Sequence, residues 1–211
     1  MKTDDLINAL ARNAGPAKNP HWRRQLVITL IAALAVAAIL VGIGLGVRPD
    51  IGAARMPVML KALFSAAAAA IVLPLVVQLM KPGRSLGWRV GAVLLFAGLC
   101  VLATVIALMG ELPEQRWEAW MGGGVPWCVV LIPLLAAPAA VLLTLMMRAF
   151  APTRLTLAGA AIGALSGGVG AMAYAMYCPV DSVAFVTTWY ALAIAVCAAL
   201  GALIVSRFLR W

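Results

Sequence analysis

Four cysteines are the side chains of this chain best suited to redox or metal chemistry, and two of them lie at the ends of apolar stretches. Cys128 opens one stretch, and Cys178 closes the next one, directly before Pro179. Two thiols at one membrane boundary can form a disulfide in an oxidising compartment, or bind a soft metal ion. Cys100 and Cys197 fall near the middle of other stretches, where cysteine usually acts as a small apolar side chain.

The positions of Cys128 and Cys178 limit what the pair can do. Cys128 lies at the start of a predicted helix, where the helix dipole favours thiolate, whereas Cys178 lies at a helix end, where it does not. We therefore expect Cys128 to be the better nucleophile or metal ligand. The chain has no CxxC motif and no histidine near either cysteine, which argues against a tetrahedral zinc site. An inert structural disulfide, or two unrelated thiols, is the alternative.

Six long apolar stretches must position these cysteines. About 20 helical residues cross a hydrocarbon core of about 30 Å, and all six stretches are that long. They cover residues 25–47, 57–79, 90–110, 127–147, 157–177 and 184–206. The chain is 65% apolar and 11% charged, with a mean hydropathy of +1.05, which excludes an ordinary soluble domain. The predicted fold is an all-α polytopic membrane protein, a bundle of six transmembrane helices.

The basic residues between the stretches predict the orientation of the bundle. Twelve of the 16 Lys and Arg residues fall in segments 1–24, 80–89, 148–156 and 207–211, which alternate along the chain with the other connections. Basic residues stay in the cytoplasm, so both termini are predicted to be cytoplasmic and Cys128 and Cys178 to lie outside. The net charge of +9 is spread over these turns, which indicates contact with anionic lipid rather than with nucleic acid.

The predicted interior lacks the charged side chains that mark most ion-coupled transporters. No Asp, Glu or Arg falls deep in a stretch, and Lys61 lies about one turn inside an outer end, from where it can reach the surface. Glycines recur instead, as Gly159-xxx-Gly163-xxx-Gly167, a spacing that lets helices approach closely. We expect this spacing to serve packing within the bundle, with a dimer face as the alternative. No catalytic residue and no cofactor are predicted.

The N-terminal segment, residues 1–24, contains a predicted partner-binding helix. Leu6, Ile7 and Leu10 share one face of it, and Gly15-Pro16 ends it. Such a short helix is not stable alone in water, and its two acidic residues make it a poor lipid binder. A groove on a partner protein is the better candidate. The remaining predicted parts are the transmembrane domain, 25–206, and a cytoplasmic tail, 207–211.

The longest outer connection is predicted to hold a short interfacial helix. Trp117, Trp120 and Met121 recur at helical spacing, and three glycines follow directly before the stretch that Cys128 opens. The helix is expected to be an aromatic anchor at the membrane surface, with a lid over the cysteines as the alternative.

Several short motifs occur in order over nearly the whole chain. They are Met1-Lys2-Thr3-Asp4-Asp5-Leu6-Ile7, Arg48-Pro49-Asp50, Pro82-Gly83, Ala151-Pro152-Thr153, Cys178-Pro179-x-x-Ser182-x-x-Phe185-x-x-x-Trp189-Tyr190 and Arg207-x-x-Arg210-Trp211. In these motifs the chain resembles the NrsF-like family, negative regulators of sigma-F. The resemblance implies a six-span anti-sigma factor of the bacterial inner membrane that holds an extracytoplasmic-function sigma factor inactive.

The resemblance also implies roles for particular residues. The N-terminal segment would contact the sigma factor, and a periplasmic-side cysteine pair, here Cys128 and Cys178, would respond to oxidants or heavy metals. The sequence thus predicts a non-enzymatic signal transducer. Two rival functions stay open: a membrane thiol–disulfide oxidoreductase that passes electrons to a quinone, and a small transporter. The oligomeric state, the sigma factor and the signal are not predicted.

Overall fold

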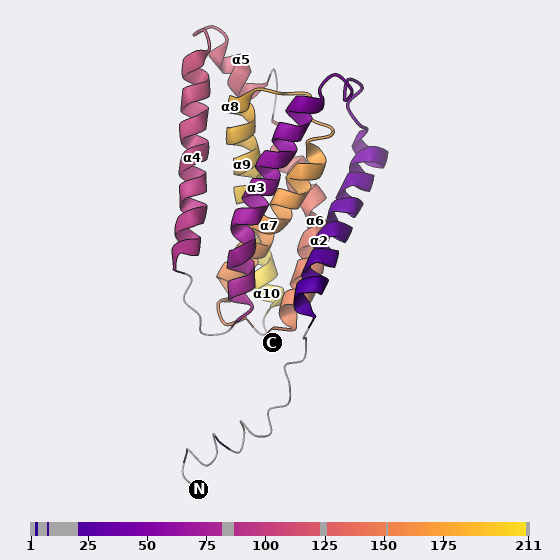
Figure 1. Ribbon diagram of the computed structural model, residues 1–211, viewed down its shortest axis with the longest axis vertical. Coiled ribbons are helices and arrows are strands. Elements are labelled where there is room, and N and C mark those ends of the chain that lie inside the picture. The colour runs from indigo at the N-terminus through magenta and orange to yellow at the C-terminus, as the bar shows by residue number, and fades with distance from the viewer. Residues whose placement is uncertain are drawn as a thin grey trace.

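The computed structural model describes Thr3, Asn8 and residues 21–81, 87–122, 126–150 and 152–209, and these are almost entirely helical (Figure 1). Helix α2 (Trp22–Leu40) continues into a π-helical turn, η1 (Val41–Leu45). The next four long helices are α3 (Arg55–Leu79), α4 (Trp88–Gly110), α6 (Cys128–Arg148) and α7 (Leu155–Tyr174), and a short helix, α5 (Arg116–Met121), precedes α6. The last span consists of α8 (Val183–Phe185), η2 (Val186–Tyr190), α9 (Ala191–Leu200), η3 (Gly201–Val205) and α10 (Ser206–Phe208).

Within the described residues, six helices are long and apolar enough to cross a membrane, as predicted. Their ends differ from the predicted ends by at most three residues. Helix α2 begins, and α10 ends, at the same end of the bundle (Figure 1). That end also holds the turn between α6 and α7, so the predicted up-and-down arrangement is confirmed. Which end faces the cytoplasm stays a prediction, as do the boundaries of segments 1–24 and 207–211.

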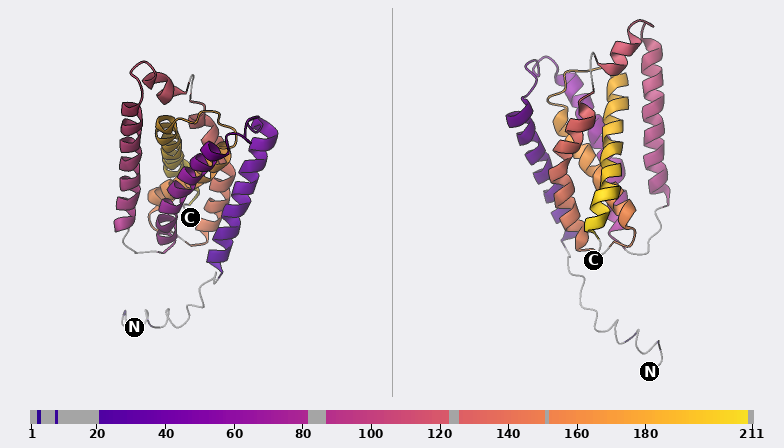
Figure 2. Two further views of the ribbon diagram at one scale, coloured as in Figure 1. Left: turned by 45° about the horizontal axis from the view of Figure 1, so that its top comes forward. Right: turned by 180° about the vertical axis from the view of Figure 1, so that it is seen from behind.

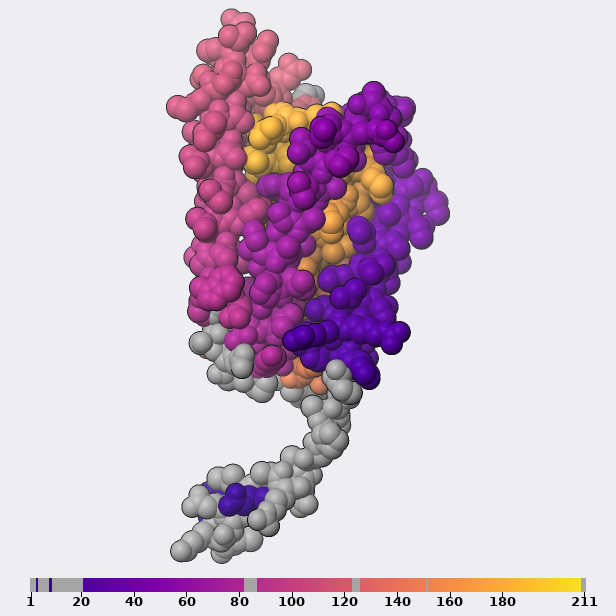
Figure 3. All heavy atoms as spheres, in the orientation of Figure 1, coloured from indigo at the N-terminus to yellow at the C-terminus, as the bar shows by residue number. Residues whose placement is uncertain are grey.

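Helix α7 is the centre of the bundle. It contacts α2, α3, α6 and the last span, and 67% of the residues in its most apolar stretch are buried. On one side α2 and α3 cover it, so that it shows between these two helices (Figure 3). From behind, α6 and the last span lie over it (Figure 2). Helix α4 is at the periphery and packs mainly on α3, α8 and η2.

Glycines allow α7 to occupy this position. A Cβ atom added to Gly163 would collide with the backbone of Cys197 and Ala198, and one added to Gly159 with the backbone of Gly201 and Ser206. A Cβ on Gly170 would meet the backbone of α6, 2.7 Å from the Ile132 oxygen. The glycine spacing therefore serves close packing inside the chain, as expected, because only a residue without a side chain fits between these backbones.

We predict that Gly163→Ala destabilises the protein by about 1–3 kcal/mol, the usual cost of overpacking, because the obstructing atoms are backbone and cannot rotate away. The measurement is the free energy of unfolding of the full chain in mild detergent. Gly98→Ala is the matched control, since a Cβ on Gly98 in α4 has nothing within 4 Å. Equal unfolding free energies for the two variants would contradict the prediction.

Candidate functional site

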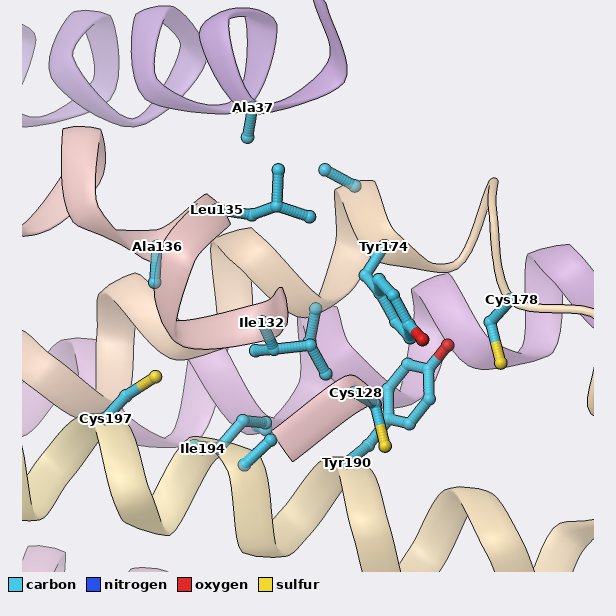
Figure 4. Packing of buried hydrophobic residues seen from close by; sticks show 14 of the residues in the cluster. Ala37, Cys128, Ile132, Leu135, Ala136, Tyr174, Cys178, Tyr190, Ile194 and Cys197 are labelled. Atoms are coloured by element: carbon cyan, nitrogen blue, oxygen red, sulfur yellow. The ribbon is translucent and has the colours of Figure 1, made fainter. Parts of the chain in front are cut away.

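Cys128 and Cys178 are brought into one buried cluster at the end of the bundle opposite to the start of α2 (Figures 1 and 4). Cys128 is the first residue of α6, and Cys178 follows the last turn of α7, where its N–H donates to the Tyr174 carbonyl at 3.1 Å. The two helices are antiparallel neighbours, which is why these ends meet. The two cysteines, which the sequence placed at one boundary of the membrane, thus belong to one apolar cluster.

Both sulfurs are shut off from solvent. Cys128 is 0% and Cys178 1% exposed, and both are free thiols in this structure. Tyr174, Tyr190 and Phe185 belong to the same apolar cluster. In the described part of the chain, no group of three or more His, Cys, Asp or Glu side chains surrounds them. The cluster therefore contains two thiols, and a reagent reaches them only after this end of the bundle opens.

The other two cysteines lie away from Cys128 and Cys178, deeper within the spans. Cys100 and Cys197 are buried at 6% and 5% exposure within the spans, and Cys197 packs against Gly163 and Gly167 of α7. Both act as small apolar side chains, as the sequence predicted.

A cluster of charges lies directly beside Cys178. Asp181 accepts hydrogen bonds from Arg48 Nη1 at 2.8 Å and Nη2 at 3.2 Å, and Lys61 Nζ lies 2.6 Å from its Oδ1 atom. Arg48 also pairs with Asp50 at 2.8 Å. The Cys178 carbonyl accepts from Lys61 Nζ at 2.8 Å and from Arg48 Nη1 at 3.2 Å. Two basic side chains, one from the connection between η1 and α3 and one from α3, thus hold the segment that carries Cys178.

These contacts change the electrostatic comparison of the two thiols. From the sequence, Cys128 was expected to be the more reactive thiol, because the negative end of the α7 dipole lies at Cys178. Arg48 and Lys61 donate to the carbonyl at that end, so they offset the partial negative charge there. The helix dipole alone is therefore not enough to rank the reactivity of Cys128 above that of Cys178.

The charge cluster holds its acidic groups ionised. Hydrogen bonds to Asp50 and Asp181 keep the pKa of Arg48 above its ordinary value. Burial alone would raise the pKa of Asp181, but the hydrogen bonds from Arg48 and Lys61 outweigh it and lower that pKa. The hydrogen bond from Arg48 also lowers the pKa of Asp50. Each acidic group is thus stabilised by a specific cation.

Sequence reasoning missed this cluster. Lys61 was expected to extend to the surface, but it is 2% exposed and paired with Asp181, 120 positions further along the chain. Arg48 had been counted only toward orientation, yet its backbone N–H also donates to the Met176 carbonyl at 3.1 Å. The available signal was an Arg, a Lys and an Asp near the ends of spans on the same side of the predicted bundle, where buried charges must be paired.

Helix α5 covers the last span beside the thiol cluster. The Trp120 indole donates to Thr188 at 3.3 Å, and the Trp189 indole donates to the Trp120 carbonyl at 2.8 Å. Gly122 ends α5 at φ +69°, and a Cβ there would meet the Val180 side chain at 2.8 Å. Trp117 is exposed, which fits a membrane anchor, while Trp120 and Gly122 are docked near the cysteine segment. The short helix predicted here is confirmed. Its exposed Trp117 suits the predicted membrane anchor, and its docked Trp120 and Gly122 suit the alternative of a lid over the cysteines.

The predicted partner-binding residues Leu6, Ile7 and Leu10 lie outside the described residues. Of their segment the structure describes Thr3 and Asn8, both helical and exposed. The assignment of that face to a partner stays a prediction.

Six apolar helices, with a thiol pair and a charge cluster at one end, define a polytopic helical membrane protein. By sequence the chain belongs to the NrsF family, described as negative regulator of sigma F, whose family model matches residues 10–211. The resemblance inferred from the motifs is therefore confirmed.

Two curated relatives align with the chain over the full length of both partners. The chain is 34% identical to the probable anti-sigma-F factor NrsF of Azospira oryzae over 214 residues. It is 36% identical to the anti-sigma-F factor NrsF of Caulobacter vibrioides over 219 residues. No solved structure is significantly similar to the chain.

We predict that Asp181→Asn destabilises the protein, because Lys61 and Arg48 stay buried without this carboxylate. Breaking a fully buried pair costs about 3–5 kcal/mol, and less is expected here since the Asp181 side chain is 34% exposed. Asp50→Asn is the matched control: its side chain is 54% exposed, so little loss of stability is expected. Unfolding in mild detergent measures both, and equal losses would contradict the assigned roles.

The same pair predicts the pH dependence of stability. The pKa of Asp181 is lower in the folded chain than its ordinary value, so the pair stabilises the fold above the ordinary carboxyl range. This contribution is lost as the pH falls through the lowered pKa. Asp181→Asn should therefore show a weaker loss of stability in acid than the parent protein.

Proposed function

We propose that this chain is an anti-sigma factor that holds a sigma factor at the membrane and releases it when chemistry occurs at Cys128 and Cys178. The observation that carries the proposal is membership of the NrsF family over residues 10–211, together with two full-length relatives named as anti-sigma-F factors. The role is regulatory and needs no catalytic residue.

The proposed arrangement follows the distribution of basic residues. The end of the bundle with the start of α2 and the α6–α7 turn faces the cytoplasm of a bacterial inner membrane, and the thiol end faces outward. The sigma factor, of the extracytoplasmic-function type, binds the face formed by Leu6, Ile7 and Leu10. An oxidant or a heavy-metal ion acts at the two thiols from the other side.

Helices α6 and α7 provide a direct connection between the two ends. Cys128 begins α6 and Cys178 follows α7, while the opposite ends of these helices meet at a short turn after Arg148. A disulfide or a metal ion that draws the thiols together changes how α6 and α7 pack, and α7 contacts α2, which leads to the N-terminal segment. Release requires that the signal stabilise one of two arrangements more than the other.

We predict that Leu10→Asp releases the sigma factor. The change removes an apolar side chain from the docking face, at a cost of about 1.5–3 kcal/mol in lost burial. Since about 1.4 kcal/mol is a factor of ten in affinity, binding should weaken at least about tenfold and sigma-dependent transcription should become constitutive. The amount of sigma factor that co-purifies with the protein measures the effect.

The matched control is Asn8→Asp, which adds the same charge at an exposed position on the opposite face and should leave binding unchanged. If Leu10→Asp retains the sigma factor while changes at Lys81 and Arg89 lose it, the docking site lies on the connection between α3 and α4, and the N-terminal assignment is wrong.

A separate prediction tests the thiols. Cys128→Ser and Cys178→Ser should each abolish sigma release by cadmium ion or oxidant, because a single remaining thiol can neither form the disulfide nor bridge the ion. Cys100→Ala and Cys197→Ala should respond like the parent, since both thiols lie within the spans. Loss of the response in all four variants would indicate general disruption of the bundle and contradict the thiol assignment.

A further inference from the structure

The most unusual polar atom near the thiols is the hydroxyl of Tyr190. Tyr190 is 0% exposed, and its hydroxyl forms no hydrogen bond with any residue in the described part of the chain. The great majority of buried hydroxyls are hydrogen-bonded. A fully buried phenol without a partner therefore points to a partner that it acquires in another state of the protein.

The surroundings of Tyr190 identify that partner. Its ring packs against the Tyr174 ring with centroids 5.8 Å apart, and its hydroxyl lies beside the Cys178 thiol without a hydrogen bond of regular geometry to it, with Cys128 in the same cluster. The close-up shows the two tyrosine hydroxyls directed toward each other in the cluster that contains the two sulfurs (Figure 4). Besides the Tyr174 hydroxyl, the polar groups that surround Tyr190 in this cluster are the two thiols.

A thiol becomes a good hydrogen-bond acceptor only when it loses its proton. Neutral cysteine sulfur is a weak acceptor, whereas bonds to ionised groups are about twice as strong as neutral ones. Binding of a soft metal ion converts thiols to thiolates, and the released protons leave to water. The tyrosine keeps its own proton, and no electrons are transferred.

We propose that the Tyr190 hydroxyl donates a hydrogen bond to a thiolate sulfur of Cys128 or Cys178 when the pair binds a soft divalent metal ion. Tyr190 is then a positioning residue of a metal site whose ligands are the two sulfurs. This inference rests on the proposed thiol function and assigns it one ligand class. Hydrogen bonds around metal ligands orient them, and their loss typically lowers metal affinity about 10–100-fold.

The position of Tyr190 also connects such a site to helix α5. Tyr190 ends η2, and π-helical turns occur frequently at functional sites. Its neighbour Trp189 donates to the Trp120 carbonyl of α5, and Thr188 of the same turn accepts from the Trp120 indole. A movement of Tyr190 toward a metal-bound sulfur therefore shifts the turn that holds α5 in place.

The test is a cadmium titration of the full-length protein in mild detergent, followed by the ultraviolet absorption of the sulfur–cadmium bonds. Tyr190→Phe keeps the ring and removes only the hydroxyl, so it should bind cadmium about 10–100-fold more weakly than the parent. Tyr177→Phe is the matched control: the Tyr177 ring also packs on Tyr174, with centroids 5.6 Å apart, and removing its hydroxyl should leave the affinity unchanged.

Stability without metal separates this role from a merely structural one. The hydroxyl has no partner in the resting structure, so metal-free Tyr190→Phe should unfold at the same temperature as the parent or a higher one. Weaker cadmium binding together with lower metal-free stability would overturn the proposal, as would unchanged cadmium affinity in Tyr190→Phe.

The cysteine variants distinguish failure of this inference from failure of the proposed function. If Cys128→Ser and Cys178→Ser lose cadmium binding but Tyr190→Phe keeps it, Tyr190 has no positioning role and the thiol site stands. If the parent protein binds no cadmium, the metal site is overturned, while retention of the sigma factor is decided separately by the Leu10→Asp experiment.

Discussion

The close approach of α7 to the last span is the constraint on which the rest of this bundle depends. Gly159 and Gly163 lie against the backbone of Gly201 and Cys197, and Gly170 lies against α6. With two neighbouring helices this close, α7 has little freedom to tilt, so its end holds Cys178 and Asp181 in place. The position of the thiol cluster follows from backbone contact rather than from the thiols themselves.

Much of the fold could be predicted from the sequence, because membrane-spanning length and hydropathy are properties of one segment at a time. The six spans and the burial of Cys197 inside its span followed from such local arguments. The pairing of Lys61 with Asp181 did not, since it depends on which spans are neighbours and how they are rotated. The isolation of the Tyr190 hydroxyl is likewise a property of packing and has no counterpart in the sequence pattern.

The charge cluster and the thiol cluster are best understood together. Arg48 and Lys61 donate to the Cys178 carbonyl, and Asp181 binds both of them, so the sulfur-bearing segment is fastened by polar contacts on one side. On the other side it faces Tyr174 and Tyr190 in an apolar cluster. Such a segment has one well-defined resting position, which a signal must alter by offering the sulfurs stronger bonds than the resting state does.

The peripheral position of α4 has a consequence for how this sequence can vary. Cys100 is its one buried residue among those described, so its neighbours are largely lipid tails rather than protein. Lipid adapts to any apolar shape, and residues of α4 can therefore exchange for one another with little loss. Along α7, by contrast, a single added carbon displaces a backbone. Substitutions are thus expected to be tolerated in α4 and excluded from much of α7, although the sequence marks both as membrane spans.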